Sequence, residues 1–269
     1  MSRGKSLPDF DTLLRLTGEI YRAAPGRETL AVTIDGNRYL LKRHTGVGWG
    51  EIVKNLLQMR PPVLGAVNEY RGLSHLAALG ITAPRVVDFQ WRGRNPARRQ
   101  SYLLSEYLEH TVSLEHYGVA ARMPIKSPAE KRTVIRRLAG IARRMHEGGL
   151  NHRDFYLCHF HVPGSLTARP PITAASPIHL IDLHRAQIRR RTPLRWRAKD
   201  LGGLLYSALD NGLTRGDCLR FVSAYRGMPA RQVLAADRRL WRRAVRNADR
   251  LYQKSGRARH PLIAWLLPR

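Results

Sequence analysis

The sequence predicts an α+β fold with two lobes, a β-rich N-terminal lobe and a mostly helical C-terminal lobe. Two β-rich runs in residues 27–44 flank Asp35-Gly36, a dipeptide that favours a tight hairpin. From residue 127 onward, helical periodicity replaces the strand patterns. This change of pattern, together with the order of the elements, is what predicts the fold class.

The change of pattern also predicts two domains. The boundary is expected near residues 110–125, which gives an N-lobe over residues 1–110 and a C-lobe over residues 111–269. A chain of 269 residues with 43% hydrophobic content is long enough to bury the core that such a plan needs.

The N-lobe elements follow in order from the hairpin, whose second strand carries Lys42 near its end. The run "GVGWGEIVKNLL" (46–57) predicts a glycine-broken loop that enters a short helix. A longer helix is expected before Gly80, and it carries Glu69. Two further strands, "RVVDFQWRG" and "SYLLSEYLE", surround the polar turn "RNPARRQ".

The C-lobe opens on the helix with the clearest signals in the chain. Ser127, Pro128 and Glu130 combine an N-cap serine, an N1 proline and a capping-box glutamate, and the helix should end at Gly148. A Pro- and Ser-rich excursion precedes the apolar run "IHLIDLH". Three more helices are expected in "KDLGGLLYSALDNG", "TRGDCLRFVSAYRG" and "DRRLWRRAVRNADRLYQK".

The charge balance predicts a polyanionic partner. The formal net charge is +27, with 47 basic against 20 acidic residues. Such an excess attracts nucleic acid, an anionic membrane face, a phosphorylated glycolipid or an acidic protein. No nucleic-acid-binding motif is recognisable, so nucleic acid is not expected. The basic C-terminal segment suits either a helix on an anionic bilayer or an ordinary amphipathic helix that completes the core.

We expect a protein of the cytoplasm, or one that is bound peripherally to a membrane. The N-terminal residues have no apolar core of signal-peptide length, and no stretch approaches the roughly 20 apolar residues of a membrane span. The two cysteines, Cys158 and Cys218, cannot form a disulfide framework.

The stretch "GLNHRDFYLCHFHV" (149–162) follows the capped helix after a glycine break and precedes a short strand pattern. In a protein kinase this order delivers a catalytic loop with an aspartate that accepts the hydroxyl proton. That aspartate is Asp154 here. An asparagine five residues later binds magnesium in kinases, and His159 stands at that place; Asp182, after an apolar run, is the expected second metal ligand.

The upstream partners in a kinase are a strand lysine that holds the phosphates and a helix glutamate that holds the lysine. Lys42 and Glu69 occupy those places. Phosphoryl transfer needs charge neutralisation and an oriented acceptor more than covalent help, which is why carboxylates, a lysine and a metal suffice. The sequence therefore predicts an enzyme that uses ATP and Mg²⁺.

Several uncommon motifs resemble one family, the lipopolysaccharide core heptose(I) kinases. They cover residues 20–230: "GVGWGEIVKNLL" with "RPPVLGAVNE", "NHRDFYLCHF", "IDLHRAQ" and "RWRAKDLGGLLYSALDNGLTRGD". The resemblance implies a two-lobed protein-kinase-like fold, in which the N-lobe binds the nucleotide phosphates and the C-lobe holds the catalytic loop, a metal site and the acceptor. The same resemblance implies ATP- and magnesium-dependent phosphorylation of the first heptose of the inner core, at the cytoplasmic face of a Gram-negative inner membrane. It also implies that a lipopolysaccharide core glycolipid is the acceptor and that Asp154 is the catalytic aspartate.

The chain departs from the kinase pattern at several points. No GxGxxG loop is present, and "AAPGRE" offers a single glycine where the first hairpin should be. Asp182-Leu183-His184 replaces Asp-Phe-Gly and no Ala-Pro-Glu follows, so no activation-loop switch is expected. An imidazole at His159 suits magnesium less well than softer ions.

Other interpretations stay open at this point. His152, Cys158, His159 and His161 offer a zinc site without any CxxC spacing, and Cys158 is expected to fill core space rather than act as a nucleophile. Asp200 is interpreted as a helix N-cap, with a tie to the catalytic-loop backbone as the alternative. Acceptor contacts are expected from the residues of the short helix, where a tryptophan can stack on a sugar: Trp49, Glu51, Lys54 and Asn55.

Two further functions also remain. One is a kinase-like phosphotransferase that acts on another small molecule or on a protein. The other is a non-catalytic binder of an acidic partner, of which an acidic carrier protein of lipid synthesis is the example that the +27 charge suits.

Overall fold

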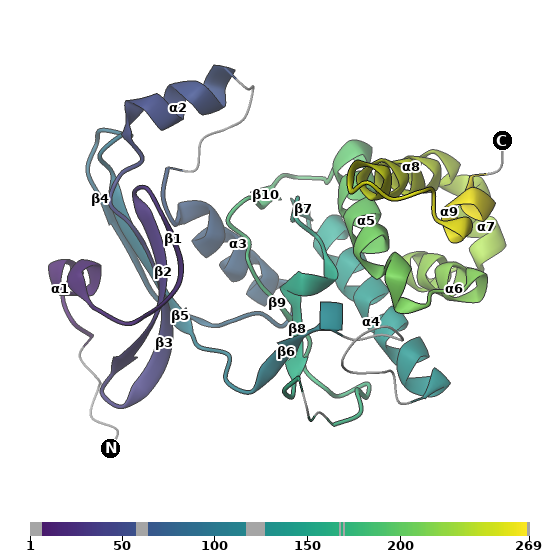
Figure 1. Ribbon diagram of the computed structural model, residues 1–269, viewed down its shortest axis with the longest axis horizontal. Coiled ribbons are helices and arrows are strands. Elements are labelled where there is room, and N and C mark those ends of the chain that lie inside the picture. The colour runs from purple at the N-terminus through teal and green to yellow at the C-terminus, as the bar shows by residue number, and fades with distance from the viewer. Residues whose placement is uncertain (1–6, 58–63, 117–126, 167, 169, 268–269) are drawn as a thin grey trace. The chain divides into compact units, whose positions relative to one another are not determined.

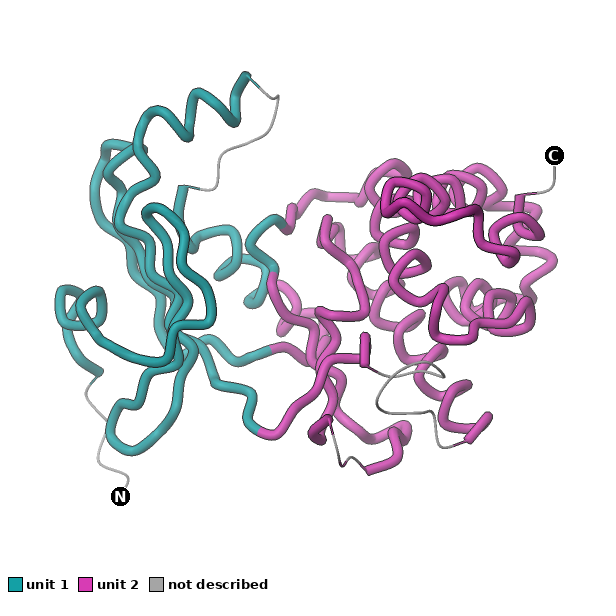
Figure 2. Tube along the Cα trace, viewed as in Figure 1, with its two compact units in different colours: residues 1–74, 84–109, 183–185 teal, residues 75–83, 110–182, 186–269 magenta. Residues whose placement is uncertain are grey.

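The computed structural model describes residues 7–57, 64–116, 127–166, 168 and 170–267, which form two compact units (Figures 1 and 2). Unit 1 comprises residues 1–74, 84–109 and 183–185, and unit 2 comprises residues 75–83, 110–182 and 186–269. Both units are therefore discontinuous in sequence. Much of the expected boundary segment, residues 117–126, lies outside the described residues.

Unit 1 is built on an antiparallel sheet of five strands in the order β1-β2-β3-β5-β4. Asp35 and Gly36 both have positive φ between the paired residues Ile34 and Asn37, which confirms the two-residue hairpin. The elements are α1 (Phe10–Arg15), β1 (Glu19–Ala24), β2 (Arg27–Ile34), β3 (Asn37–His44), α2 (Gly48–Leu57), α3 (Val67–Ala78), β4 (Val86–Arg92) and β5 (Gln100–Glu106).

The core of unit 1 lies where α1 meets the sheet. Leu13 of α1 is fully buried against residues of β2, β3 and β5, among them Leu30, Leu41 and Tyr102. Neither α1 nor β1 is evident from the sequence pattern, because α1 is only six residues long and most of β1 is exposed. The helices predicted at residues 46–57 and before Gly80 are both present, and Gly80 adopts the positive φ of a terminating residue.

Unit 2 is mostly helical. Ser127 accepts a hydrogen bond from the N–H of Glu130 and so caps α4, as expected. The elements are β6 (Thr111–Ser113), η1 (Leu114–His116), α4 (Pro128–Glu147), β7 (Leu150–Asn151), η2 (Leu157–His159), β8 (Phe160–Pro163), β9 (His179–Leu180), β10 (Gln187–Ile188), α5 (Leu194–Ala208), η3 (Leu209–Asn211), α6 (Arg215–Arg226), α7 (Ala230–Ala236), α8 (Arg238–Lys254) and α9 (Pro261–Leu266).

Helix α5 runs between α8 and the segment that contains Asp154. A Cβ at Gly202 would lie 2.7 Å from the carbonyl oxygen of Ala244 in α8, and one at Gly203 would lie 3.1 Å from that of Phe155. Two adjacent glycines therefore allow close approach on both sides of one helix.

The basic C-terminal segment forms helix α8, which the sequence left open as a membrane-bound helix or as part of the core. Its apolar residues are buried in unit 2, and its arginines are exposed, so it completes the core as an amphipathic helix does. The buried residues are Leu240, Trp241, Ala244, Val245, Ala248 and Tyr252. Within the described part of the chain, no helix is both long and apolar enough to cross a bilayer.

Candidate active site

The loop after α4 is held by the buried carboxylate of Asp200. Its Oδ2 accepts the N–H of His152 and its Oδ1 accepts the N–H of Arg153, both at 2.8 Å. Nε2 of His146 lies 3.3 Å from Oδ2. Asp200 is fully buried and stands in the middle of α5, so the N-cap interpretation is wrong and the tie to the loop backbone is correct.

The reason for that error is local. Helix α5 begins five residues earlier than the sequence pattern suggests, at Leu194 after Pro193, so Asp200 has helix on both sides. The carboxylate accepts hydrogen bonds from two backbone N–H groups that have no acceptor within the irregular loop. It fixes the path of the chain into Asp154.

His159 joins the loop of Asp154 to the segment of Asp182. Its Nδ1 lies 2.6 Å from the carbonyl oxygen of Asp154, and its backbone oxygen accepts the N–H of Ile181 at 3.0 Å. Its Nε2 lies 3.5 Å from Oδ2 of Asp182. The structure therefore brings the three residues predicted for catalysis and metal binding together within unit 2.

The tautomer of His159 follows from these contacts. A carbonyl oxygen only accepts, so Nδ1 must donate its hydrogen to Asp154. In the neutral ring, Nε2 then carries a lone pair that faces the carboxylate of Asp182. A cation between the two groups, or a proton on Nε2, relieves that repulsion. The donor set of one carboxylate and one imidazole at this spacing fits a divalent metal.

The backbone is strained at two places in this site. Arg153 has φ 76° and Asp182 has φ 62°, both in the left-handed region. Non-glycine residues hold this conformation only where the surroundings impose it, and such residues cluster at functional sites. No sequence signal marks the conformation of Arg153, whereas aspartate is one of the residues that adopts the left-handed region more readily than most.

Burial keeps the neighbouring titratable groups neutral. It lowers the pKa of fully buried His152, whose Nε2 lies 3.0 Å from the carbonyl oxygen of Ile181. It raises the pKa of Cys158 to about 11, so this thiol is not a nucleophile near neutral pH. In the described part of the chain no group of three or more His, Cys, Asp or Glu side chains is arranged to hold a metal, which disfavours the four-ligand zinc interpretation.

Unit 1 contains the other predicted pair. Nζ of Lys42 in β3 lies 2.5 Å from Oε1 of Glu69 in α3, with side-chain exposures of 18% and 7%. The pairing of β3 with β2 on one side and with β5 on the other fixes the position of Lys42 within the sheet. The ammonium group is thus preorganised by a carboxylate that is itself buried.

The residues expected to contact the acceptor all lie on α2 in unit 1. Trp49 is 58% exposed. The side-chain nitrogen of Asn55 donates to the backbone oxygen of Glu51 at 2.8 Å and to its Oε1 at 2.9 Å, and Nζ of Lys54 lies 3.7 Å from Oε2 of the same glutamate. The polar members of this set interact with one another, and their contact with an acceptor remains a prediction.

The first hairpin turn of the sheet connects β1 and β2 and contains Gly26, which has φ 71°. A Cβ at Gly26 would lie 2.0 Å from the carbonyl oxygen of Gly46, so the turn packs directly on the loop before α2. A glycine is required there for close approach of two backbones within unit 1.

The family described as "Lipopolysaccharide kinase (Kdo/WaaP) family" matches residues 11–225 of the chain. The chain is 41% identical over 249 residues to the lipopolysaccharide core heptose(I) kinase WaaP of Pseudomonas aeruginosa, covering 92% of this chain and 91% of the relative. It is 40% identical over 255 residues to the protein of that name from Escherichia coli K12, covering 95% and 94%.

A solved structure described as "WaaP in complex with acyl carrier protein" superposes with a TM-score of 0.72 at 35% identity. The match covers 90% of this chain and 92% of that one. The predicted α+β, protein-kinase-like fold is confirmed by this similarity.

Proposed function

The chain belongs to the lipopolysaccharide kinase (Kdo/WaaP) family, and on that premise we propose that it phosphorylates the first heptose of a lipopolysaccharide core with Asp154 as the catalytic base. It is an ATP-dependent sugar kinase. The observation that carries the proposal is the contact of His159 with both Asp154 and Asp182, which holds the two aspartate segments of unit 2 in one constellation.

Asp154 acts on the acceptor hydroxyl. Its carboxylate accepts a hydrogen bond from the hydroxyl, orients the oxygen for in-line attack on the γ-phosphorus, and takes the proton as the new P–O bond forms. The bond from the γ-phosphorus to the bridging oxygen breaks in the same step, and ADP leaves. Asp200 keeps the loop in position during this step, because it accepts hydrogen bonds from the N–H groups of His152 and Arg153. Orientation by a fixed loop removes much of the entropic cost of bringing the reactants together.

Asp182 and His159 would hold Mg²⁺. Magnesium in phosphotransferases is bound through one or two carboxylates together with substrate phosphates and water, and this pair leaves room for both. The ion supplies charge neutralisation at the phosphates. The hydrogen bond from Nδ1 of His159 to Asp154 would orient Nε2 as a ligand.

Lys42 would hold the nucleotide phosphates, and Glu69 would keep its ammonium group in place. The residues of α2 (Trp49, Glu51, Lys54 and Asn55) would contact the acceptor sugar.

The test is a phosphorylation assay with purified heptosylated core lipid and ATP. Asp154→Asn should keep its fold by circular dichroism and lose about a thousandfold in kcat, as expected for removal of a positioned base. Asp210→Asn is the matched control, because this carboxylate is half-exposed and pairs with Arg257. Full activity of Asp154→Asn would contradict the proposal.

The same assay separates the alternative acceptors. Core lipid, a soluble sugar and a generic protein substrate are compared under one set of conditions. Phosphate should appear on the heptose of core lipid, and its position can be located by NMR. Preference for a soluble sugar or for protein would support a different kinase-like phosphotransferase.

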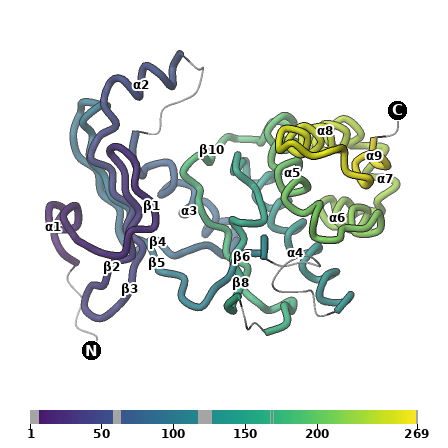
Figure 3. Tube along the Cα trace, viewed as in Figure 1, coloured from purple at the N-terminus to yellow at the C-terminus, as the bar shows by residue number. Residues whose placement is uncertain are grey.

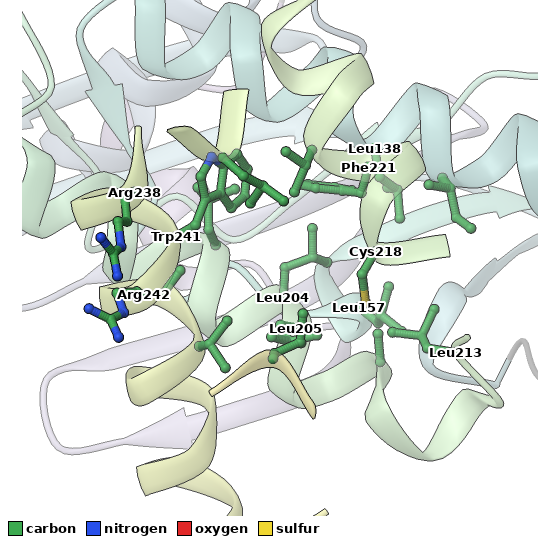
Figure 4. Close-up of a pocket in the computed structure, with 18 residues that line it drawn as sticks. Leu138, Leu157, Leu204, Leu205, Leu213, Cys218, Phe221, Arg238, Trp241 and Arg242 are labelled. Carbon is green, nitrogen blue, oxygen red and sulfur yellow. The ribbon is translucent and has the colours of Figure 1, made fainter. Parts of the chain in front are cut away.

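An acyl carrier protein is the second partner that we propose, and a cavity in unit 2 favours it. The cavity has a volume of about 350 Å³ and lies between α5, α6 and α8. Its lining is almost wholly apolar, with Leu157 of the catalytic segment on one wall (Figure 4). Arg238 and Arg242 lie together at one side of it. Such a space suits the acyl chain of a carrier, and the arginines suit its acidic surface.

This second proposal is tested by binding of acylated and unacylated carrier. Leu205→Trp should fill cavity space and weaken binding of the acylated form only. Arg238→Glu with Arg242→Glu should weaken both forms and reduce the salt dependence, whereas Arg132→Glu on exposed α4 surface should leave binding unchanged. Equal binding of acylated carrier to Leu205→Trp and to the unchanged protein would sink the idea.

The kinase is further proposed to work in the cytoplasm, in peripheral contact with the anionic inner membrane. The support is that the acceptor is a sugar on a lipid anchor and that the net charge is +27.

A further inference from the structure

Helix α2 exposes its apolar face instead of burying it. Trp49, Val53, Leu56 and Leu57 are 58%, 50%, 59% and 80% exposed, and their spacing places them on one stripe. Ile52 is the buried residue of this helix. A surface helix normally turns such a stripe toward the core, so this stripe is available to something outside unit 1.

A basic turn lies beside the start of this helix. The N–H of Gly48 donates to the carbonyl oxygen of Ala97 at 3.0 Å, which ties α2 to the turn between β4 and β5. That turn presents Arg94 and Arg98 to solvent. Figure 3 shows α2 beyond one end of the sheet, where β4 also ends.

A second tryptophan lies next to the turn. Trp91 is 52% exposed, and the guanidinium of Arg99 lies 4.9 Å from its ring centroid. Tryptophan is the side chain that favours the boundary between lipid and water, since its ring is apolar and its N–H is polar.

We propose that α2 and the β4–β5 turn form a membrane-docking surface that inserts into the interface of an anionic bilayer. We define this surface by its apolar residues, Trp49, Val53, Leu56 and Leu57, and by its basic residues, Arg94 and Arg98. The apolar stripe would enter the boundary between headgroups and acyl chains, while the guanidinium groups meet lipid phosphates. The inference rests on the proposed function in one respect, namely that the acceptor is anchored in lipid.

The chemistry of this surface favours a bilayer over a protein partner. An amphipathic helix with an interfacial tryptophan and neighbouring arginines combines the two attractions that hold peripheral proteins on anionic lipid. The acidic carrier has a different surface to bind, the arginines of α8 in unit 2. The helix also lies in the chain directly between Lys42 and Glu69, so docking would act on the segment that joins the phosphate-binding pair.

Vesicle co-sedimentation without ATP or acceptor tests the proposal directly. The protein should bind vesicles of phosphatidylcholine with phosphatidylglycerol better than phosphatidylcholine alone. Leu56→Glu should lose roughly tenfold or more in partitioning, because a charge replaces an apolar contact. Met228→Glu is the matched control, an equal change at a 42% exposed apolar residue in unit 2.

The basic part is tested by Arg94→Ala with Arg98→Ala. This double variant should lose about tenfold in binding to the anionic vesicles, lose little on phosphatidylcholine, and show a weaker dependence on salt. Unchanged vesicle binding by Leu56→Glu, or equal losses in Met228→Glu, would overturn the proposal.

Trp49 reports where the helix lies. Brominated lipid should quench part of the tryptophan emission in the unchanged protein, and Trp49→Phe should remove that part. Shielding of Trp49 from acrylamide in the lipid-free protein would instead mean that the chain covers its own stripe. If Leu56→Glu sediments as a smaller oligomer than the unchanged protein, a second copy of the chain covers the stripe. Either result would overturn the proposal.

An activity comparison separates this inference from the kinase function. Leu56→Glu should phosphorylate a deacylated, soluble core acceptor at the unchanged rate and act poorly on acceptor embedded in vesicles. Loss on both acceptors would mean that Leu56 itself serves acceptor binding or the fold of unit 1, and would contradict the membrane role. If the unchanged protein phosphorylates neither acceptor, the kinase proposal fails while the vesicle result stands on its own.

Discussion

Nε2 of His159 lies 3.5 Å from Oδ2 of Asp182, with its other ring nitrogen committed to the carbonyl oxygen of Asp154. A kinase places an asparagine amide where this imidazole stands. The imidazole offers one lone pair in a fixed direction, whereas an amide oxygen offers two, so the metal preference of the site should differ from that of a protein kinase.

His159→Ala should raise the concentration of Mg²⁺ needed for half-maximal activity by about 10- to 100-fold, as loss of an ordered metal partner does. His159→Asn should restore part of the affinity. Titration of activity with Mg²⁺ and with Mn²⁺ checks both points. We expect Mn²⁺ to support the unchanged protein relatively better than His159→Asn, since imidazole is the softer ligand. Identical metal titrations for all three proteins would exclude His159 as a ligand.

Glu69→Gln should leave Lys42 in place without its counter-charge. We expect kcat/KM for ATP to fall roughly 100-fold, because the ammonium is no longer held in position for the phosphates. Steady-state kinetics at varied ATP measure this. Glu19→Gln is the control: it removes the partner of Arg38 in an exposed pair, where the expected effect on activity is nil and that on stability is below about 1 kcal/mol.

Asp200→Ala should destabilise unit 2 by about 3 kcal/mol, since two buried backbone N–H groups lose a charged acceptor. Urea unfolding followed by tryptophan fluorescence gives the value. Asp200→Asn retains one acceptor oxygen, so its free energy of unfolding should lie between those of the unchanged protein and Asp200→Ala. A loss below about 1 kcal/mol in Asp200→Ala would show that water replaces the carboxylate.

His44 gives the stability of unit 1 a pH dependence. Burial, with Arg27, Lys42 and His184 nearby, lowers its pKa from 6.5 to about 4. The folded form therefore binds this proton more weakly than the unfolded chain does. Above about pH 6.5, His44 has no effect on the free energy of unfolding. As the pH falls from 6.5 toward 4, His44 lowers this free energy progressively, by about 3 kcal/mol at the end of the range.

His44→Phe should abolish this part of the pH dependence. Urea unfolding at several values between about pH 4.5 and pH 7.5 is the measurement, a range that includes the unfolded pKa of 6.5 and most of the interval down to the folded pKa of about 4. The variant is compared with the unchanged protein at each pH, because buried His152 contributes in the same direction in both. Parallel stability curves for the two proteins would contradict the assignment to His44.

Much of this fold follows from local chemistry that a sequence displays. Asp35-Gly36 can turn a hairpin without help from the rest of the chain, and Ser127 caps α4 through an atom three residues away. Elements α1 and β1 cannot be recognised in this way, because α1 is only six residues long and is stabilised by packing on the sheet, and β1 is an edge strand with mostly exposed side chains.

The candidate site divides in the same way. Lys42, Glu69, Asp154 and Asp182 are recognisable because their order along the chain is itself informative. For Asp200 the sequence leaves an N-cap and a tie to the catalytic-loop backbone both open, because its partners lie 47 and 48 residues away and no nearby residue decides between the two. The contact of His159 with the carbonyl oxygen of Asp154 likewise exists only in the folded loop. It determines the tautomer of the imidazole, which the sequence alone could not.

Gly202 and Gly203 allow α5 to pack closely on both sides, between the apolar cavity of unit 2 and the loop that carries Asp154. One of its faces meets α8, which helps to line the apolar cavity, and the other meets the loop that carries Asp154. A methyl group on either side would push a neighbour away through several tenths of an ångström or more. At these two positions the approach of α5 to α8 and to the loop is thus set without a side chain of α5 in between, and a side chain at either glycine would have to displace its neighbour.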